Sequence, residues 1–319
     1  MKRLVSIVYP VLNEAEGASM LADRMASLVQ LNHDYELEFV VVDDGSTDST
    51  TEILKAAIDP SINLRVVTLA RNFGSHAALS AGLHAARGDC AILLGADLQE
   101  PESLVTDFLT SWSSGYEVVW GVRNERKVRS RSSKAASVLF SQLFTRYADL
   151  ENYPPEGPSG VLCDRAVIDV VSKLGERNRN LYGLVAWVGF KQTKVNFEQR
   201  DRKAGSSKWT TRKLVKLALD SLVQFSSAPI RLMSYIGLAF ASIGFLYATV
   251  LVGRAVFIRR GPEGWTSVVV AVLVIGGVQL LMLGLLGEYL WRGVDETRQR
   301  ALYIIDKRKS TDYNRERSS

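Results

Sequence analysis

Two long stretches near the carboxyl end contain no charged residue, and they restrict the possible folds more than any other feature. Residues 232–253 are uncharged over 22 positions and residues 267–286 over 20. Because an α-helix rises about 1.5 Å per residue, each stretch would form a helix of about 30 Å, the thickness of a bilayer's hydrocarbon core. A short link rich in glycine and arginine joins them. The sequence therefore predicts two transmembrane helices within residues 232–290, at about 232–256 and 266–289.

Positive charge is concentrated on the two outer sides of this predicted hairpin. The link holds three arginines, whereas more basic residues precede and follow the hairpin, and such an excess marks the cytoplasmic side. We therefore expect a multi-pass protein of the inner (cytoplasmic) membrane, with its globular domain and both termini in the cytoplasm. The net charge of +5 then indicates an anionic membrane rather than nucleic acid. The flanking basic residues are Arg202, Lys203, Lys208, Arg212, Lys213, Lys216, Arg231, Arg292, Arg298, Arg300, Lys307, Arg308 and Lys309.

The segments that border the hairpin also carry a pattern. Residues 206–231 place apolar side chains at helical spacing among basic ones and include Trp209, which is typical of amphipathic helices at a membrane interface. Residues 291–319 form a basic tail that we expect in the cytoplasm. Residues 1–205 remain as one globular domain. The competing interpretation of the hairpin is a pair of core helices buried in a soluble protein.

Short apolar runs alternate with amphipathic segments throughout the first half of the globular domain. The runs at residues 4–9, 37–42, 64–69 and 90–94 are predicted strands. Their alternation with helices predicts an α/β fold, Rossmann-like, with a mostly parallel sheet and right-handed crossovers. Beyond it we expect strands at 117–121 and 191–199, helices at 164–174 and 179–187, and a proline- and glycine-rich loop at 153–160.

Polar residues follow the ends of all four predicted strands. Because parallel strands bring their carboxyl ends to one edge of the sheet, these residues should meet there and form a binding site. The first strand is followed by PVLNEAEG rather than by G-x-G-x-x-G, which argues against a dinucleotide site, and the sequence has no Walker loop. The clustered residues are Pro10, Asn13, Glu14, Asp43, Asp44, Arg71, Asn72, Asp97 and Gln99.

The fourth of these strands ends in a motif suited to a divalent cation. Residues 90–101 read CAILLGADLQEP, an apolar run that ends in Asp97, Gln99 and Glu100. Mg²⁺ and Mn²⁺ prefer hard oxygen ligands and are often held by one or two carboxylates together with substrate phosphates. Asp97 and Gln99 therefore predict metal-assisted binding of a diphosphate. The alternative is an ordinary solvated turn, since an isolated Asp-Leu-Gln also occurs by chance.

A strongly basic segment, RNERKVRSRSSK at residues 123–134, leaves several interpretations open. It is a solvated loop, a polybasic stretch on anionic lipid, or a clamp for phosphate, because arginine offers bidentate donors. The three histidines do not have the spacing of a metal site, and we expect His76 and His84 on a helix surface or partly buried. The two cysteines provide no disulfide framework.

Seven short motifs follow one another along the chain. They are YPVLNEAE (9–16), VVVDDGSTDST (40–50), ARNFGSHAALSAGL (70–83), GADLQEP (95–101), GVR (121–123), WVGF (187–190) and RKAGSSKW (202–209). Together with the hairpin they resemble the family 2 glycosyltransferases of the polyprenyl-phosphate type. That group includes dolichol-phosphate mannose synthases and the bacterial undecaprenyl-phosphate glycosyltransferases with a C-terminal membrane hairpin.

This resemblance implies a GT-A fold for the globular domain. It also implies inverting transfer of a sugar from a nucleotide-diphosphate sugar (UDP- or GDP-linked) to a polyprenyl (undecaprenyl) phosphate at the cytoplasmic membrane face, for cell-envelope glycan modification. The implied cofactor is Mg²⁺ or Mn²⁺, and the implied partners are the donor, the acceptor and the membrane, with no nucleic acid. A homo-oligomer and a downstream flippase remain open.

The resemblance assigns roles to residues at matching positions. It places Asp97 and Gln99 on the metal and, with Ala96, on the diphosphate. The residues expected to line the nucleotide pocket are Pro10, Leu12, Glu14, Val42 and Asp44. Those expected at the lipid phosphate are Arg123, Lys134 and Ser137. Arg202 and Lys208 would close over the donor diphosphate, so that the expected catalytic residues are Asp97, Arg123, Arg202 and Lys208.

The chain departs from the family pattern at two positions. The family has Asp-x-Asp where this chain has Gly95-Ala96-Asp97, and it has an acid often discussed as a base where this chain has Ser159. These losses keep a second interpretation open, a catalytically impaired homologue that binds a nucleotide sugar or lipid phosphate. A transferase with a hydroxyl acceptor is a weaker alternative, because that chemistry needs a general base. Glu100 is a candidate to compensate for the acid missing at Gly95.

Overall fold

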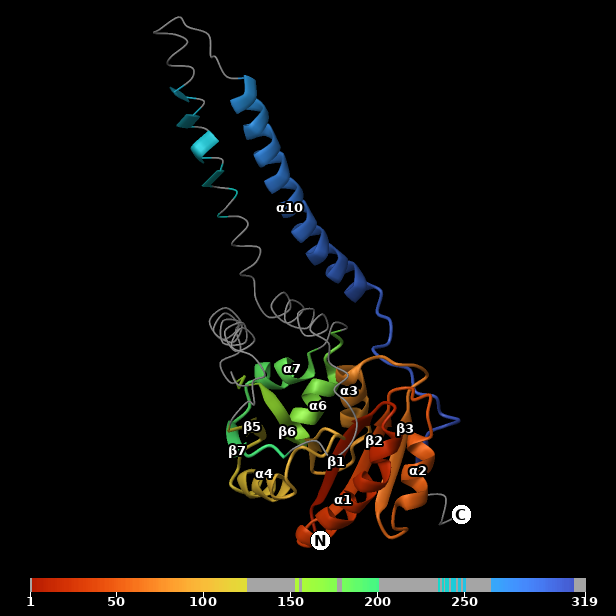
Figure 1. Ribbon diagram of the computed structural model, residues 1–319. Coiled ribbons are helices and arrows are strands. Elements are labelled where there is room, and N and C mark those ends of the chain that lie inside the picture. Colours follow the sequence, from red (N-terminus) through yellow and green to blue (C-terminus); the bar gives the residue numbers. More distant parts are fainter. Residues whose placement is uncertain are drawn as a thin grey trace, which may run out of the picture. The chain divides into compact units, whose positions relative to one another are not determined.

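A computed structural model describes residues 2–124, 153–154, 157–176, 180–200 and 265–312, together with scattered helical positions between 235 and 250. The chain divides into two units, Met1–Ser221 with Arg300–Ser319, and Leu222–Gln299. Each unit has its own secondary structure (Figure 1).

An eight-stranded sheet forms the centre of the first unit, with the order β7-β5-β6-β4-β1-β2-β3-β8 (Figure 1). The strands are β1 (Leu4–Val11), β2 (Glu36–Asp43), β3 (Asn63–Thr68), β4 (Cys90–Leu93), β5 (Val118–Arg123), β6 (Pro158–Asp164), β7 (Gln192–Phe197) and β8 (Thr311–Asp312). The helices of this unit are η1 (Ala15–Gly17), α1 (Ala18–Leu31), α2 (Thr50–Ala57), α3 (Ser75–Ala85), α4 (Ser103–Ser113), α6 (Arg165–Lys173) and α7 (Leu181–Trp187).

The predicted α/β fold with a mostly parallel sheet is confirmed. Strand β1 pairs in parallel with both β2 and β4, and β2 pairs in parallel with β3, so all four predicted strands point the same way. These strands are buried on both faces, which explains why they read as continuous apolar runs rather than as alternating ones. Their carboxyl ends consequently lie at one edge of the sheet.

Alternate side chains of β1 pack against two separate layers of helices, one on each face of the sheet. Val5, Ile7 and Tyr9 belong to the core cluster that α1, α2 and α4 complete. Val8 lies on the other face against α3, where a side chain at Gly82 would collide with it. Glycine at this position therefore lets α3 approach the sheet closely.

Strand β6 was not predicted from the sequence. Residues 153–160 were expected to be a loop, but Pro158 begins a strand that pairs antiparallel with β4 on one side and β5 on the other. Proline is tolerated there because it occupies the first residue of the strand. That expectation was therefore wrong for residues 158–160, and β6 inserts an antiparallel strand between two parallel groups.

The segment after the predicted hairpin returns to the sheet. Thr311 and Asp312 form β8, antiparallel to β3, and Ile305 makes an isolated bridge to Leu69. The N–H of Ala70 donates to the carbonyl of Ile304 at 2.8 Å. Residues 291–319 were predicted as a basic tail, and the structure shows that part of this tail covers the edge of the sheet.

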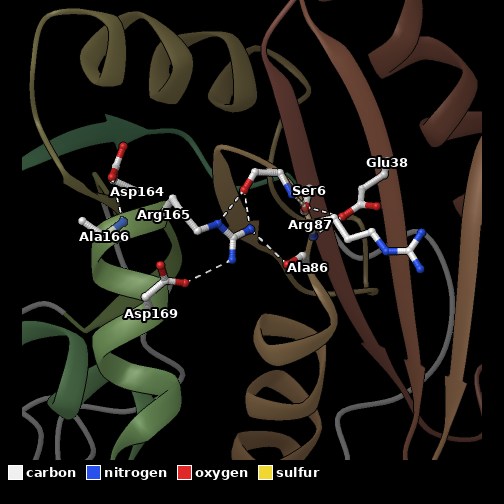
Figure 2. Close-up of polar contacts among 9 residues, drawn as sticks. Ser6, Glu38, Ala86, Arg87, Asp164, Arg165, Ala166 and Asp169 are labelled. Atoms are coloured by element: carbon white, nitrogen blue, oxygen red, sulfur yellow. Dashed lines mark hydrogen bonds and ion pairs between the residues drawn. The ribbon is translucent and has the colours of Figure 1, made fainter.

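A buried polar network holds the turn that leads into β4 (Figure 2). The Glu38 carboxylate accepts hydrogen bonds from the Ser6 hydroxyl at 2.5 Å and from the N–H of Arg87 at 2.6 Å, and Ser6 in turn accepts from the N–H of Gly88 at 2.8 Å. From the other side, the Arg165 guanidinium donates to the carbonyls of Gly88 and Ala86 (Figure 2). Strand β4 is thereby fixed at the end opposite the predicted metal-binding motif.

The second unit contains one long described helix, α10 (Trp265–Thr297; Figure 1). Within the described residues, one helical stretch is long and apolar enough to cross a membrane, Val274–Asp295, with mean hydropathy 1.5 and none of it buried. The second predicted span, 266–289, lies inside α10. The first span is described at scattered positions only, all helical, and residues 206–231 lie outside the described residues.

Candidate active site

The four predicted polar clusters do gather at one edge of the sheet. Residues 12–16 follow β1, residues 44–48 follow β2, residues 69–74 follow β3 and residues 94–100 follow β4. The order β4-β1-β2-β3 makes their carboxyl ends neighbours. Ligands of open α/β sheets bind at this kind of edge.

The loop after β1 is held against the loop after β2 by side chain to backbone hydrogen bonds. The N–H of Asn13 donates to the Ser46 hydroxyl at 3.0 Å, and the Asn13 side-chain oxygen accepts from the N–H of Thr47 at 2.8 Å. Glu14 is bound in the same way to Thr50, at 2.8 Å. Asn13 has a φ of 50°, a left-handed conformation that asparagine tolerates better than most residues. Asn13 and Glu14 therefore hold together the two loops that border the site.

Asp44 holds the loop after β3. Its two carboxylate oxygens accept the N–H groups of Phe73 at 2.7 Å and Gly74 at 2.9 Å. Burial raises the pKa of the Asp44 carboxyl above its ordinary value, and these two hydrogen bonds oppose that shift. Asp44 was expected beside the base and ribose of the nucleotide. In the structure its carboxylate holds the backbone of Phe73 and Gly74 in place.

The other residues expected in the nucleotide pocket differ in their exposure. Pro10 and Leu12 are half-buried and lie at the edge. Val42 is fully buried, and its side chain faces α3 beside Gly82. A nucleotide at this edge would therefore contact the backbone of Val42 and not its side chain. The apolar run in the sequence did not reveal this orientation of Val42.

The motif after β4 combines exposed and buried polar groups. Ala96, Asp97 and Gln99 are half-buried, whereas Leu98 packs in the core with a φ of 58°. A left-handed conformation is strained for a bulky residue and is often found at functional sites. Leu98 thus fixes the turn that presents Asp97 and Gln99.

Glu100 closes this motif as a nearly buried carboxyl group, 3% exposed. Burial and the neighbouring Asp97 raise its pKa to about 7, while Arg24 and Arg123 oppose the shift. Arg24, itself 4% exposed, donates from Nη1 to the backbone carbonyl of Glu100 at 2.7 Å. Arg24 was missed in the sequence, although a charged residue on the apolar face of Leu21, Met25 and Leu28 was a signal.

Arg123 lies at the end of β5 and contacts β6. Its Nε donates a hydrogen bond to the hydroxyl of Ser159 at 2.5 Å. The two strands lose their regular register at this point, between Gly121 and Val122. Arg123, expected at the lipid phosphate, is therefore in contact with the position where the family pattern has an acid.

Arg200 connects the motif after β4 to the segment that follows β7. Its backbone N–H donates to the carbonyl of Gln99 at 2.9 Å, and its guanidinium pairs with Glu102 at 2.6 Å. No sequence pattern distinguished Arg200 from the basic residues around it. The expected site residues Lys134, Ser137, Arg202 and Lys208 lie outside the described residues.

No group of three or more His, Cys, Asp or Glu side chains suited to a metal ion occurs in the described part of the chain. His76, as expected, is partly buried: it accepts the N–H of Leu181 through Nδ1 at 3.3 Å and meets the ring of Tyr182 edge-on. Burial lowers the pKa of His76 to about 4.

Because the described residues contain no group of three metal-binding side chains, a divalent ion at Asp97 and Gln99 would need further ligands from its substrate.

Two sequence families match this chain. Residues 6–172 match the family described as glycosyl transferase family 2, and residues 228–292 match one described as the GtrB C-terminal hairpin. The first match covers the sheet edge described above, from β1 to α6. The second covers both predicted membrane spans.

Several curated relatives match over nearly their whole length. The uncharacterized glycosyltransferase YkcC of Bacillus subtilis is 37% identical over 305 residues, which cover 95% of this chain and 93% of the relative. The bactoprenol glucosyl transferase of Shigella phage SfX is 33% identical over 305 residues, 96% of this chain and 99% of the relative. The prophage bactoprenol glucosyl transferase homolog of Escherichia coli is 32% identical, with 95% and 98% covered.

Solved structures resemble the chain more weakly. Mannosyl-3-phosphoglycerate synthase from Rubrobacter xylanophilus superposes with a TM-score of 0.48 at 18% identity, over 73% of this chain and 75% of that one. The family of the chain follows from the sequence matches alone.

Proposed function

Because this chain belongs to glycosyl transferase family 2 and is a glycosyltransferase, we propose that it transfers a sugar from a nucleoside-diphosphate donor to undecaprenyl or another polyprenyl phosphate. The observation that carries the proposal is that one chain matches both glycosyl transferase family 2, over residues 6–172, and the GtrB C-terminal hairpin family, over residues 228–292. Among the relatives that match over nearly their whole length, those of Shigella phage SfX and Shigella flexneri are named bactoprenol glucosyl transferases. The product would serve modification of a cell-envelope glycan.

The donor diphosphate would lie at the carboxyl end of β4. Asp97 and Gln99 offer one carboxylate and one amide oxygen there, both half-buried, and these are ligands that fit Mg²⁺ or Mn²⁺. A divalent ion at this point would neutralise charge that develops on the leaving diphosphate. The residues after β1 and β2 would hold the base and ribose, with Pro10, Leu12 and Glu14 at the edge.

Arg202 and Lys208 would add positive charge on the other side of the diphosphate. Arg200 supports this placement, because its N–H is bound to Gln99 within the metal motif. Cationic side chains there stabilise the departing diphosphate more in the transition state than in the bound donor.

The acceptor phosphate would be bound by Arg123, with Lys134 and Ser137. An oxygen of this phosphate attacks the anomeric carbon, the bond to the nucleoside diphosphate breaks, and the configuration inverts. A phosphate monoester has a second pKa of about 6, so the attacking oxygen is already ionised near neutral pH. Ser159 in place of an acid is compatible with this chemistry, because no proton has to be removed.

The course of the chain supports an even number of membrane crossings. Residues before 222 and residues after 299 belong to the same unit, and β8 pairs with β3 in its sheet. A folded unit lies on one side of a membrane, so any segment that leaves it and returns must cross twice or not at all. We therefore propose a two-helix hairpin in the inner membrane, with the catalytic unit and both termini cytoplasmic.

The test is incubation of the full chain in detergent or lipid nanodiscs with undecaprenyl phosphate and a panel of UDP- and GDP-sugars, followed by mass spectrometry of the lipid. We expect one glycosyl-phosphoryl lipid, formed only with a divalent cation and lost in Asp97→Ala. Release of free sugar without a lipid product would contradict the proposal. Binding of donor and lipid without transfer would favour the second candidate, a catalytically impaired binding subunit, which Gly95 and Ser159 suggest.

A further inference from the structure

Gly95 leaves a space between two carboxyl groups. A Cβ atom placed on Gly95 would lie 3.1 Å from Oδ1 of Asp97 and 3.8 Å from Oε1 of Glu100. Both oxygens thus approach the point from which a side chain at position 95 would start. The family pattern has an acid at this position, and here Glu100 comes close to it from three residues beyond Asp97.

One oxygen of the Glu100 carboxyl group lacks a hydrogen-bond partner in the described structure. Its Oε2 atom is buried and has no hydrogen-bond partner among the described residues. Arg24, the adjacent buried cation, donates to the backbone carbonyl of Glu100. A buried oxygen without a partner is costly, because its hydration has been lost without replacement. Because Oε1 of the same carboxyl group approaches position 95, a cation there would give this carboxyl group the partner that its Oε2 lacks.

We propose that Glu100 supplies the second acidic ligand of the divalent cation, in place of the acid absent at Gly95. This inference rests on the proposed function, which places a cation and a diphosphate at Asp97 and Gln99. Two carboxylate oxygens and one amide oxygen leave room in an octahedral shell for phosphate oxygens and water. Coordination would also satisfy the unpartnered oxygen of Glu100.

Backbone contacts hold Glu100 in place for this role. The hydrogen bond from Arg24 fixes its carbonyl, and the left-handed Leu98 makes the turn in which Asp97 and Glu100 lie three residues apart. Glu100 is therefore held with its carboxyl group close to Asp97, at the point where a side chain at position 95 would begin.

The experiment measures Mn²⁺ binding rather than turnover. Free Mn²⁺ is titrated by electron paramagnetic resonance on the full chain in detergent, with Mn²⁺ alone and then with UDP or GDP added. Glu100→Gln should raise the Mn²⁺ dissociation constant by about tenfold or more, the size of effect known when partners around a metal are removed. The double variant Gly95→Asp with Glu100→Gln should recover most of that loss, because the acid returns at the family position.

Asp107→Asn, which removes an exposed carboxylate on α4, is the matched control and should bind Mn²⁺ like the wild type. Wild-type affinity in Glu100→Gln, with loss in Asp97→Asn, would overturn the role of Glu100 and leave the proposed function intact. Absence of Mn²⁺ binding in the wild type under all three conditions would instead count against the metal in the proposed function. If Glu100→Gln does not fold, the double variant decides, since failure to bind Mn²⁺ in a folded double variant also overturns the inference.

Discussion

Arg123, the last residue of β5, contacts Ser159 near the start of β6: Nε of Arg123 donates a hydrogen bond to the Ser159 hydroxyl at 2.5 Å. A carboxylate at position 159, as in the family pattern, would form an ion pair with this guanidinium. A hydroxyl accepts this hydrogen bond without adding a negative charge. Ser159 is therefore compatible with the proposed binding of a lipid phosphate by Arg123.

Substitution of Ser159 should separate binding from chemistry. Ser159→Ala should keep turnover within about threefold of wild type, because a phosphate acceptor needs no general base, whose loss costs about 10²-fold or more. Ser159→Asp should raise KM for the polyprenyl phosphate about tenfold, because the new carboxylate pairs with Arg123. Steady-state kinetics with varied lipid measure both. Ser19→Asp, which adds the same charge at an exposed position of α1, serves as the control for Ser159→Asp. A loss of turnover above about 100-fold in Ser159→Ala would assign the hydroxyl a chemical role.

Removal of the carboxyl-terminal strand should weaken the sheet. A chain that ends at Tyr303 lacks β8 and the ion pairs from Asp312 to Arg65 at 3.3 Å and to Arg87 at 2.9 Å. It also exposes the edge of β3, which promotes aggregation. We expect a melting temperature lower by about 4 to 8 °C, which corresponds to about 2 kcal/mol for a unit of this size. A chain that ends at Asp312 keeps the strand, and equal melting temperatures of the two chains would show that β8 contributes no stability.

Gly88 should not tolerate a side chain. A Cβ atom there would lie 2.7 Å from the carbonyl oxygen of Cys90 and 2.7 Å from the nitrogen of Ser6, both backbone atoms that cannot move independently of the sheet. Gly88→Ala should therefore cost about 1–3 kcal/mol or more. Gly175→Ala is the control, because no described atom beyond Gly175 and its two chain neighbours lies within 4 Å of the added Cβ. Thermal unfolding followed by tryptophan fluorescence compares them, and a Gly88→Ala melting temperature equal to that of Gly175→Ala would contradict the expected clash.

The buried His76 should make stability depend on pH. Its pKa is lowered to about 4 by burial, against about 6.5 in an unfolded chain. Between these values the unfolded chain binds a proton that the folded chain does not, so stability falls as the pH drops from about 6.5 to about 4. His76→Asn keeps an acceptor for the N–H of Leu181 and does not titrate. Melting temperatures at pH 7 and pH 5 should fall further for the wild type than for this variant, and parallel decreases would refute the assignment.

Regular patterns made the first half of the fold predictable. The parallel strands β1 to β4 were recognisable because both of their faces are buried, so that each reads as an apolar run ended by polar residues. The gathering of these polar residues at one edge followed from strand direction alone. Strand β6 escaped prediction because its first residues, Pro158 to Gly160, resemble a loop and are paired only through partners distant in sequence.

The candidate site was predictable to the level of its motifs. Asp97 and Gln99 stand out because polar residues directly after a buried parallel strand lie at the edge where such sheets bind ligands. The environment of Glu100 was not predictable, since it depends on Arg24, which lies 76 residues away on α1. Burial and long-range pairing, which set the charge state of such a group, are properties of the packed chain.

By itself, the sequence determined an α/β unit with polar residues at one edge of its sheet and an apolar carboxyl-terminal region, because local periodicity and the length of uncharged stretches are properties of neighbouring residues. The tertiary structure decided which strands pair, that the tail returns to β3, and that Glu100 faces the space at Gly95. The strand pairings and the return of the tail join segments far apart along the chain, and Glu100 is held by Arg24, which lies 76 residues away on α1, so only folding brings these atoms within bonding distance.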